Sequence, residues 1–215
     1  MHHEPIRVAY NTVVDLVPGL HDPARANQPK PDITLHIGLA AGRDFYTLER
    51  GAHGTGYGAI PDVDGLRFSD EQSEAKFPRD LFPPVLQTSF HVDDVVARWK
   101  KNLGVHAASL DDPIDEERSA PDVRPSPDAG NFMCGFIYYN SLAHYYHVKE
   151  DERPVAFMHV PDLSHDDKKL EMGKEVAVAL IKALVQSRKE TGVVDVGVQG
   201  KGGPAIAAGM DVNFA

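Results

Sequence analysis

The 215-residue sequence contains a single cysteine, Cys134, and this scarcity limits how the protein can be stabilised. One cysteine cannot form an internal disulfide, so the sequence favours a reducing, cytosolic setting. Long apolar runs are also missing, and no stretch approaches the roughly 18 apolar residues that a membrane span requires. The first residues lack the apolar core of a secretory signal. These absences predict a cytoplasmic protein with no membrane partner.

Basic residues are outnumbered as well, with 22 Lys and Arg against 32 Asp and Glu and a formal net charge of −10. Proteins that bind nucleic acids need a basic face that displaces counterions from phosphates, and here basic residues gather only in short pairs. The composition therefore argues against a nucleic-acid partner. The 42% of hydrophobic and 25% of charged residues are ordinary values for a globular protein.

Apolar residues at helical spacing predict three helices. The clearest covers residues 92–103, where acidic side chains occupy the first turn, lysines the last turn, and a glycine follows. A longer helix is expected over residues 167–189, with a capping box that begins at Ser164 and a C-terminal stop at Gly192. A weaker pattern predicts a helix over about residues 9–20.

Short apolar runs between these helices have the character of strands. They show little alternation of polar and apolar residues, which suits strands covered on both faces in a mostly parallel sheet. Helix and strand alternate along the chain, so the predicted fold is α/β, a three-layer α/β/α sandwich with a mostly parallel central sheet. The expected strands are residues 33–39, 45–48, 105–110 and 155–160.

The remaining segments are interpreted as loops and a tail. Residues 61–86 and 111–127 are rich in Pro, Asp and Ser, which predicts long surface loops. Residues 193–215 contain a Gly-Lys-Gly-Gly-Pro run that is typical of a loose tail. The chain has no internal repeat and is long enough for one substantial core, so we expect a single domain over residues 1–192.

Three residues with catalytic chemistry lie at the ends of expected elements. Glu49 follows the strand at 45–48, His159 lies at the end of the strand at 155–160, and Cys134 lies after a loop that leads into a further helix expected through residues 136–139. In an open α/β sheet, ligands bind beyond the carboxyl ends of the strands, where distant residues converge. A thiol near a helix N-terminus feels the helix dipole, which favours the thiolate. An imidazole can take its proton, and a carboxylate can fix the imidazole tautomer. Alone, each residue has a structural explanation, because free cysteine is usually buried, but together they indicate a nucleophilic site.

Three motifs, in the order Glu, Cys, His, resemble the pyroglutamyl peptidase I (pyrrolidone-carboxylate peptidase) family of cysteine peptidases. The stretch PDITLHIGLAAGR at 31–43, followed by LER at 48–50, resembles the segment that carries the family's glutamate. SPDAGNFMCGFIYY at 126–139 is similar to the nucleophile segment of eukaryotic members, and FMHVP at 157–161 resembles the histidine motif. The resemblance extends over residues 8–184.

The resemblance implies an activity, the removal of N-terminal pyroglutamate from peptides without a cofactor or metal. Cys134 would form a thioester with the pyroglutamyl group, His159 would act as base and then as acid, and Glu49 would orient His159. The lactam ring is uncharged, so an apolar pocket is expected. By position, the residues that would line it are Phe132, Met133, Ile60 and the backbone at Leu39. Plain core packing explains Met133 and Leu39 equally well.

The sequence departs from the family pattern at three places. Members typically open with a strand of the Val-Thr-Gly-Phe kind, whereas this chain begins near the end of the next strand, at residues 6–9. A sheet and a pocket that are incomplete at the N-terminal side are therefore expected. Ala59 stands where bacterial relatives carry an arginine near the oxyanion, and Gly135 where they carry an asparagine. Oxyanion stabilisation would then depend more on backbone N–H groups.

Two alternatives stay open. The first is a non-catalytic or truncated homologue of the same fold, because sites rather than scaffolds carry activity. The second is a metal site, although no HExxH or CxxC motif is present. Its candidate ligands are His144 and His147, which can share one helix face, and His53, His91 and His106. The family includes monomers and tetramers, so a homo-oligomer also stays open.

Overall fold

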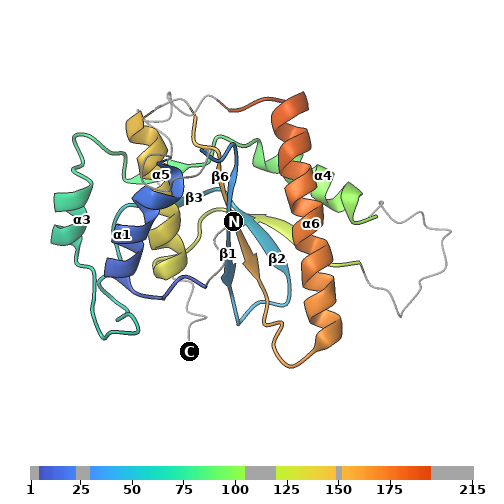
Figure 1. Ribbon diagram of the computed structural model, residues 1–215, viewed down its shortest axis with the longest axis horizontal. Coiled ribbons are helices and arrows are strands. Elements are labelled where there is room, and N and C mark those ends of the chain that lie inside the picture. Colours follow the sequence, from blue (N-terminus) through green and yellow to red (C-terminus); the bar gives the residue numbers. More distant parts are fainter. Residues whose placement is uncertain (1–4, 23–29, 105–119, 149–151, 195–215) are drawn as a thin grey trace.

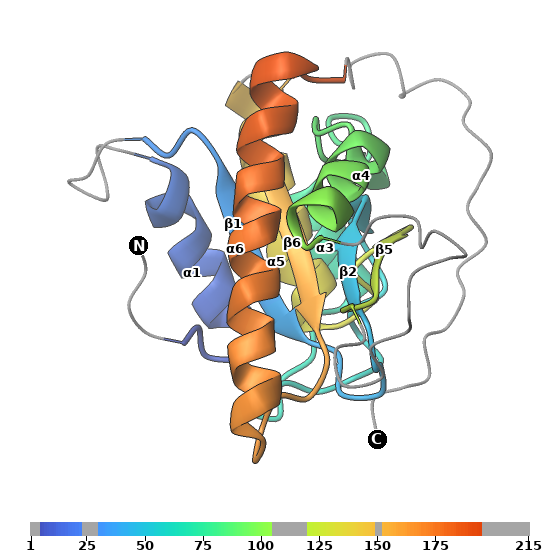
Figure 2. The same ribbon diagram turned by 90° about the vertical axis from the view of Figure 1, so that its right-hand side faces the viewer.

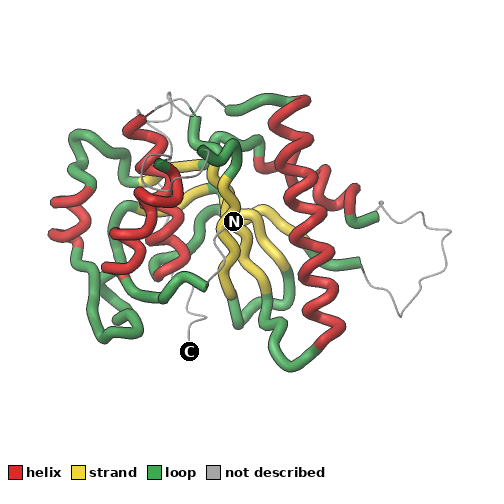
Figure 3. Tube along the Cα trace, viewed as in Figure 1, coloured by secondary structure: helices red, strands yellow, loops and turns green. Residues whose placement is uncertain are grey.

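The computed structural model describes residues 5–22, 30–104, 120–148 and 152–194, and in these residues a sheet lies between two layers of helices (Figure 1). Helices α1 (Tyr10–His21), α3 (Asp70–Lys76) and α5 (Met133–Val148) lie on one side of the sheet. Helices α4 (Val92–Asn102) and α6 (Asp167–Glu190) lie on the other side. The tube in Figure 3 shows the same three layers, so the predicted α/β/α sandwich is confirmed.

The central sheet of the described residues has the strand order β1-β6-β2-β5. Its strands are β1 (Thr34–Leu39), β6 (Val155–Val160), β2 (Tyr46–Glu49) and β5 (Val123–Ser126). β1 pairs with β6 and β2 pairs with β5 in parallel, whereas β6 and β2 are antiparallel. The mostly parallel sheet is confirmed, with one antiparallel junction that the sequence did not predict. A small second sheet pairs β3 (Gly51–His53) with β4 (Val85–Gln87).

Alternate residues of the strands enter two different cores, one on each face of the sheet. Leu48 and Met158 belong to the core that includes α4 and α6, and Figure 2 shows these two helices side by side on that face. The buried indole of Trp99 in α4 donates a hydrogen bond to the carbonyl of Val176 in α6 over 2.9 Å, which ties the two helices together. On the opposite face, Phe157 packs in the core that is built around α5.

The predicted helices are confirmed, with one correction at a cap. α6 begins after Asp166, whose carboxylate accepts hydrogen bonds from the backbone N–H groups of Lys168 and Lys169. The predicted capping box at Ser164 is therefore wrong, because the nearer carboxylate caps the helix. Gly192 follows α6 with a φ of 84°, a left-handed conformation that glycine adopts without strain.

Two predicted loops contain regular structure. Residues 61–86 include α3, which Ser69 and Gln72 begin with a reciprocal capping box, and the first residues of β4. Residues 111–127 include β5, where Pro125 is tolerated because β5 is an edge strand of the described sheet. The strand expected at 105–110 and most of the expected tail lie outside the described residues. Among the helices that are described, none is both long and apolar enough to cross a membrane.

The expected burial of the strands on both faces holds for two strands and is wrong for a third. All four residues of β2 and the first five of β6 are buried. In β1, by contrast, Ile37 and Leu39 are 55% and 52% exposed. The difference arises because β1 is an edge strand of the described sheet, whereas β6 and β2 have a neighbour on each side.

Candidate active site

Three residues form a row across neighbouring strands on the face of the sheet that α5 covers. In the strand register, Gly38 of β1 is the partner of His159 of β6, and His159 is the partner of Thr47 of β2. Cys134, the second residue of α5, lies against Gly38, since a Cβ atom placed on Gly38 would be 2.9 Å from the thiol Sγ. The fold thus brings the predicted nucleophile and the predicted base to adjacent positions.

Glu49 joins this row from the end of β2. It lies two residues after Thr47, so both side chains point to the same face of the sheet. Its Oε1 is 2.8 Å from Nδ1 of His159, and the two side chains are 0% and 3% exposed. With Nδ1 bound to the carboxylate, Nε2 of His159 is the free ring position, and it has no hydrogen-bond partner among the described residues. The imidazole is therefore oriented to accept a proton at Nε2.

The environment of Cys134 opposes ionisation of the resting thiol. Burial, followed by the negative charge of Glu49, raises its pKa to about 12, while the positive charge of Arg43 lowers it in part. The dipole of α5 was expected to favour the thiolate, but burial outweighs it. The thiol is therefore neutral at rest and must lose its proton when it reacts. Catalytic hydrogen bonds that are absent from an unliganded site commonly form when substrate binds.

The loop before Cys134 is held by a small set of polar contacts. The carboxylate of Asp128 accepts a hydrogen bond from the backbone N–H of Gly130 over 2.9 Å, and its other oxygen lies 3.5 Å from Nε2 of His53. This loop presses on the start of α5, because a Cβ atom at Gly135 would lie only 1.8 Å from the carbonyl oxygen of Gly130. The glycine after the nucleophile is thus required by the loop, and an asparagine there would displace it.

The structure brings two of the predicted pocket residues together. The hydroxyl of Tyr10 in α1 donates to the carbonyl of Ile60 at 3.1 Å and to that of Tyr57 at 2.9 Å. The same tyrosine ring contacts Phe132 edge-on, with ring centroids 6.4 Å apart. Tyr10 therefore links the loop that contains Ile60 to the residues just before the nucleophile.

The other two predicted pocket residues are placed less favourably. Met133 is buried in the core around α5, which agrees with plain packing. Leu39 is next to Gly38 on β1, so its side chain points to the opposite face of the sheet from Cys134. The backbone at Leu39, rather than the side chain, is the part that can approach the thiol, as expected from the sequence.

Sequence reasoning missed four residues that contact this site, namely Gly38, Arg43, Thr47 and Tyr10. Two of them could have been inferred from the sequence. A glycine inside a strand often marks a close approach, which is the role of Gly38 beneath the thiol. Thr47 is two positions before Glu49 and so had to share its face of the strand. Arg43 and Tyr10 reach the site only through the turns and packing of the fold.

The histidines considered as metal ligands are not brought to one place. The ring of His144 packs against that of His21, with centroids 5.2 Å apart, whereas His147 stacks on Phe82 with centroids 6.4 Å apart. His106 lies outside the described residues. In the part of the chain that the structure describes, no three or more His, Cys, Asp or Glu side chains gather as a metal ion would require.

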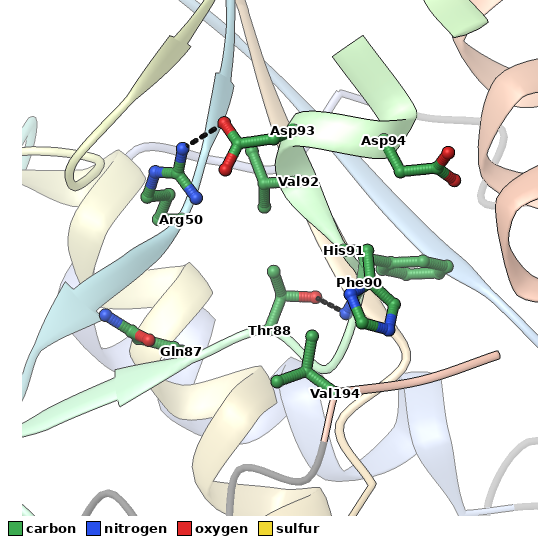
Figure 4. A pocket seen from close by; sticks show the side chains of 9 residues that line it. All are labelled: Arg50, Gln87, Thr88, Phe90, His91, Val92, Asp93, Asp94 and Val194. Carbon is green, nitrogen blue, oxygen red and sulfur yellow. Dashed lines mark hydrogen bonds and ion pairs between the residues drawn. The ribbon is translucent and has the colours of Figure 1, made fainter. Parts of the chain in front are cut away.

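A cavity of about 230 Å³ lies at the start of α4 and is separate from the predicted catalytic residues (Figure 4). Its walls include Arg50, which forms an ion pair with Asp93, and His91. The hydroxyl of Thr88 in the same wall accepts a hydrogen bond from the backbone N–H of Phe90 over 3.3 Å. None of the three predicted catalytic residues lines this cavity, so the chemistry of the site does not take place there.

No protein-family model matches the chain, but several curated proteins do. The chain is 30% identical over 132 residues to pyrrolidone-carboxylate peptidase of Pyrococcus furiosus, an alignment that covers 61% of this chain and 52% of that protein. It is 25% identical over 185 residues to human pyroglutamyl-peptidase 1, which covers 86% of this chain and 73% of that protein. The chain thus spans about half the length of the Pyrococcus relative.

Solved structures of pyrrolidone carboxyl peptidases and of a pyroglutamyl peptidase have the same fold as this chain. A mutant pyrrolidone carboxyl peptidase from the hyperthermophile Pyrococcus furiosus superposes with a TM-score of 0.59 at 21% identity, covering 84% of this chain and 79% of that one. Pyroglutamyl peptidase I from Bacillus amyloliquefaciens gives a TM-score of 0.55 at 21% identity, covering 83% and 75%. The chain has the pyrrolidone carboxyl peptidase fold, and the resemblance expected from the three motifs is confirmed.

Proposed function

We propose that this protein is a cysteine peptidase that removes N-terminal pyroglutamate from peptides. The observation that carries the proposal is the buried pair of His159 and Glu49, which are 2.8 Å apart, with Nε2 of His159 unpartnered among the described residues. His159 is the strand partner of Gly38, against which the thiol of Cys134 lies. A nucleophile, a base and a group that orients the base are the components of acyl transfer. The similarity to proteins named pyroglutamyl-peptidase supports the choice of substrate.

Acylation of Cys134 is the first half of the proposed reaction. The thiol proton passes to Nε2 of His159 as the sulfur attacks the carbonyl carbon that joins the pyroglutamyl group to the next residue. The resulting imidazolium is stabilised by the carboxylate of Glu49 through Nδ1. His159 then returns the proton to the nitrogen of the leaving amine as the C–N bond breaks, and a thioester remains on Cys134.

Hydrolysis of the thioester is the second half. His159 accepts a proton from a water molecule as the water oxygen attacks the thioester carbonyl. When the C–S bond breaks, the proton returns to the sulfur, pyroglutamic acid leaves and the neutral thiol is restored. The raised pKa of Cys134 fits this cycle, because the resting enzyme holds a protonated thiol that ionises only with the help of the base.

An apolar wall is expected for the uncharged lactam ring, and we propose that Phe132 and Ile60 form it. Tyr10 contacts both of these residues. Its hydroxyl holds the carbonyl of Ile60, and its ring meets the partly buried Phe132. These residues come from separate parts of the chain, and both contact Tyr10. Phe132 and Ile60 are therefore our proposed contacts to the lactam, together with the backbone at Leu39.

The proposed setting of the enzyme follows from its chemistry. The chain has a single cysteine and so no internal disulfide, and the cytosol keeps such a thiol reduced, so we place the protein in the cytoplasm. We assign the activity to one domain over residues 1–192, with peptides that begin with pyroglutamate as its partners. Neither nucleic acid nor membrane enters the proposed reaction, and a homo-oligomer stays open.

Hydrolysis of a fluorogenic pyroglutamyl amide by the purified protein tests the proposal. Wild type should release the fluorophore, iodoacetamide should stop the release, and EDTA should leave it unchanged. Cys134→Ala should lose turnover while its thermal unfolding stays close to that of wild type. If folded wild type gives no turnover that depends on Cys134, the chain is the non-catalytic homologue of the same fold instead.

A further inference from the structure

A single carboxylate oxygen of Glu49 collects three polar contacts. Besides Nδ1 of His159, Oε1 lies 2.5 Å from the hydroxyl of Thr47 and 3.3 Å from Nη1 of Arg43. The same Nη1 donates to the hydroxyl of Thr47 over 3.0 Å. Arg43 therefore reaches Glu49 both directly and through Thr47, which accepts from the guanidinium and donates to the carboxylate.

Burial makes these contacts necessary. The side chain of Glu49 is fully buried, and its second oxygen, Oε2, has no hydrogen-bond partner among the described residues. A buried carboxylate is costly unless it is paired and hydrogen-bonded. Among the described residues, the carboxylate is therefore stabilised through Oε1, by Thr47, Arg43 and His159.

The two donors are held rigidly. Thr47 is buried in β2 as the strand partner of His159, and a β-branched side chain has few rotamers. Arg43 lies in the turn between β1 and β2, where its backbone N–H donates to the carbonyl of Ala40 over 3.0 Å. Its side chain is only 17% exposed, so the guanidinium is directed inward rather than into solvent.

We propose that Arg43 and Thr47 are positioning residues of the catalytic site, and we call the pair the Glu49 clamp. The clamp holds the carboxylate in the orientation that fixes His159, so that Nε2 points toward Cys134. Its positive charge also offsets that of Glu49 at the thiol. This inference rests on the proposed function for its effect on turnover, while its effect on the thiol can be measured separately.

Paired substitutions test the clamp. Thr47→Val removes the hydroxyl at nearly constant shape, and Thr47→Ser restores it. Arg43→Met removes the charge, and Arg43→Lys restores it. Matched controls are Thr34→Val in β1, whose hydroxyl lies near His21, and Arg98→Met, whose ion pairs are with Asp94 and Glu190.

Two readouts are measured on each folded variant, which thermal unfolding identifies. The first is the pH profile of kcat and KM with the fluorogenic pyroglutamyl amide. The second is the rate at which iodoacetamide alkylates Cys134 across neutral to alkaline pH, which needs no substrate. Loss of packing alone would lower stability but would move neither pH profile.

The clamp predicts a loss in kcat with KM nearly unchanged. Thr47→Val and Arg43→Met should each lower kcat by roughly tenfold or more, since a hydrogen bond to a charged group is lost. The pH profile of kcat should differ from that of wild type in both variants, because these donors hold the carboxylate that orients His159. Alkylation should require higher pH in Arg43→Met, because the positive charge that lowers the pKa of the Cys134 thiol is lost. Thr47→Ser and Arg43→Lys should recover most of the wild-type behaviour.

The outcomes separate the clamp from the proposed function. Turnover by wild type, together with unchanged profiles in Thr47→Val and Arg43→Met, would overturn the clamp and leave the peptidase assignment intact. If wild type shows no turnover, the peptidase assignment fails. The pH dependence of Cys134 alkylation in the variants then tests the clamp by itself. A shift of the same size in Thr34→Val or Arg98→Met would also count against it.

Discussion

The two faces of the central sheet are built from alternate residues of the same strands, yet they bury different chemistry. Toward α4 and α6, Leu48 and Met158 pack in an apolar core around Trp99. Toward α5, their immediate neighbours Glu49 and His159 form a buried, hydrogen-bonded polar pair. A step of one residue along a strand thus separates a side chain that stabilises the fold from one that carries the chemistry.

The two faces also differ in whether the buried polar atoms described here have hydrogen-bond partners. On the face toward α5, Oε2 of Glu49 and Nε2 of His159 are buried and have no partner among the described residues. Such atoms are costly in a folded protein and are commonly found where a substrate or a proton must be received. On the face toward α4 and α6, the buried indole N–H of Trp99 does have a partner, the carbonyl of Val176.

Substitutions at the adjacent residues 158 and 159 should give the largest difference between the two faces, one in activity and the other in stability. His159→Ala should lower kcat/KM by roughly a thousandfold, because the general base is lost, with a small change in stability. Met158→Ala should keep kcat/KM near that of wild type but cost about 2–5 kcal/mol of unfolding free energy, because a fully buried side chain leaves a cavity. Urea unfolding and amide hydrolysis measure the two effects, and the reverse pattern would refute the division between the faces.

The matching pair on β2 should behave in the same way with a smaller effect on rate. Glu49→Gln keeps the shape of the side chain but removes the charge that orients and stabilises His159, so kcat should fall by roughly tenfold to a hundredfold. Leu48→Ala should instead lower stability by about 2–5 kcal/mol with kcat preserved. A larger loss of kcat in Leu48→Ala than in Glu49→Gln would contradict this account.

Gly38 allows a test of how closely the thiol fits the sheet. A Cβ atom there would lie 2.7 Å from Cζ of Phe157 and 2.9 Å from Sγ of Cys134, so Gly38→Ala requires both contacts to be relieved. We expect kcat/KM to fall by roughly tenfold, because the thiol moves relative to His159. The same substitution at Gly19 in α1 meets no atom within 4 Å and should leave the rate unchanged. Equal rates for the two variants would show that the thiol is not held against β1.

The face toward α5 should also make the protein sensitive to acid. Burial lowers the pKa of His36 to about 4, and burial, with the charges of His36, His144 and Lys30, lowers that of His21 to about 3. Both rings are neutral when folded, whereas the unfolded chain takes up protons below pH 6.5, the ordinary value. Stability is therefore complete above that pH and is lost as the pH falls toward the folded values.

Between pH 7 and pH 5 the loss should be about 2 kcal/mol for each ring, measured by urea unfolding. His36→Gln should reduce this dependence, because it removes one of the two titrating groups. His165→Asn, at an exposed loop position, should keep the wild-type dependence. A dependence that is unchanged in His36→Gln would show that another group is responsible.

Sequence patterns that extend over a few residues were enough to predict much of the fold. The helix at 92–102 had an apolar stripe, charged ends and a stop at Gly104, and each of these signals acts within a few residues. α3 was missed although Ser69 and Gln72 have the spacing of a capping box. A helix of seven residues in a Pro- and Asp-rich segment is too short to show a helical period of apolar residues. β5 was hidden by Pro125, which only an edge strand tolerates.

The site required more than local patterns. Glu49 and His159 are 110 residues apart in the chain, and no spacing rule brings them within 2.8 Å. Their association was predicted from the family resemblance, whereas the antiparallel pairing of β6 with β2 that places Thr47 beside His159 depends on the whole sheet. The protonated state of Cys134 was also beyond the sequence, because burial is a property of the packed molecule.

The most direct test of the central claim is a search for the acyl-enzyme itself. Wild-type protein is mixed with excess pyroglutamyl amide, quenched in acid within the first turnovers, and analysed by intact mass and peptide mapping. The account predicts a mass increase of one pyroglutamyl acyl group on Cys134, absent from Cys134→Ala and removed when the unquenched protein is left to exhaust its substrate. Turnover of the amide without any acyl group on Cys134, or at an unchanged rate in Cys134→Ala, would contradict it.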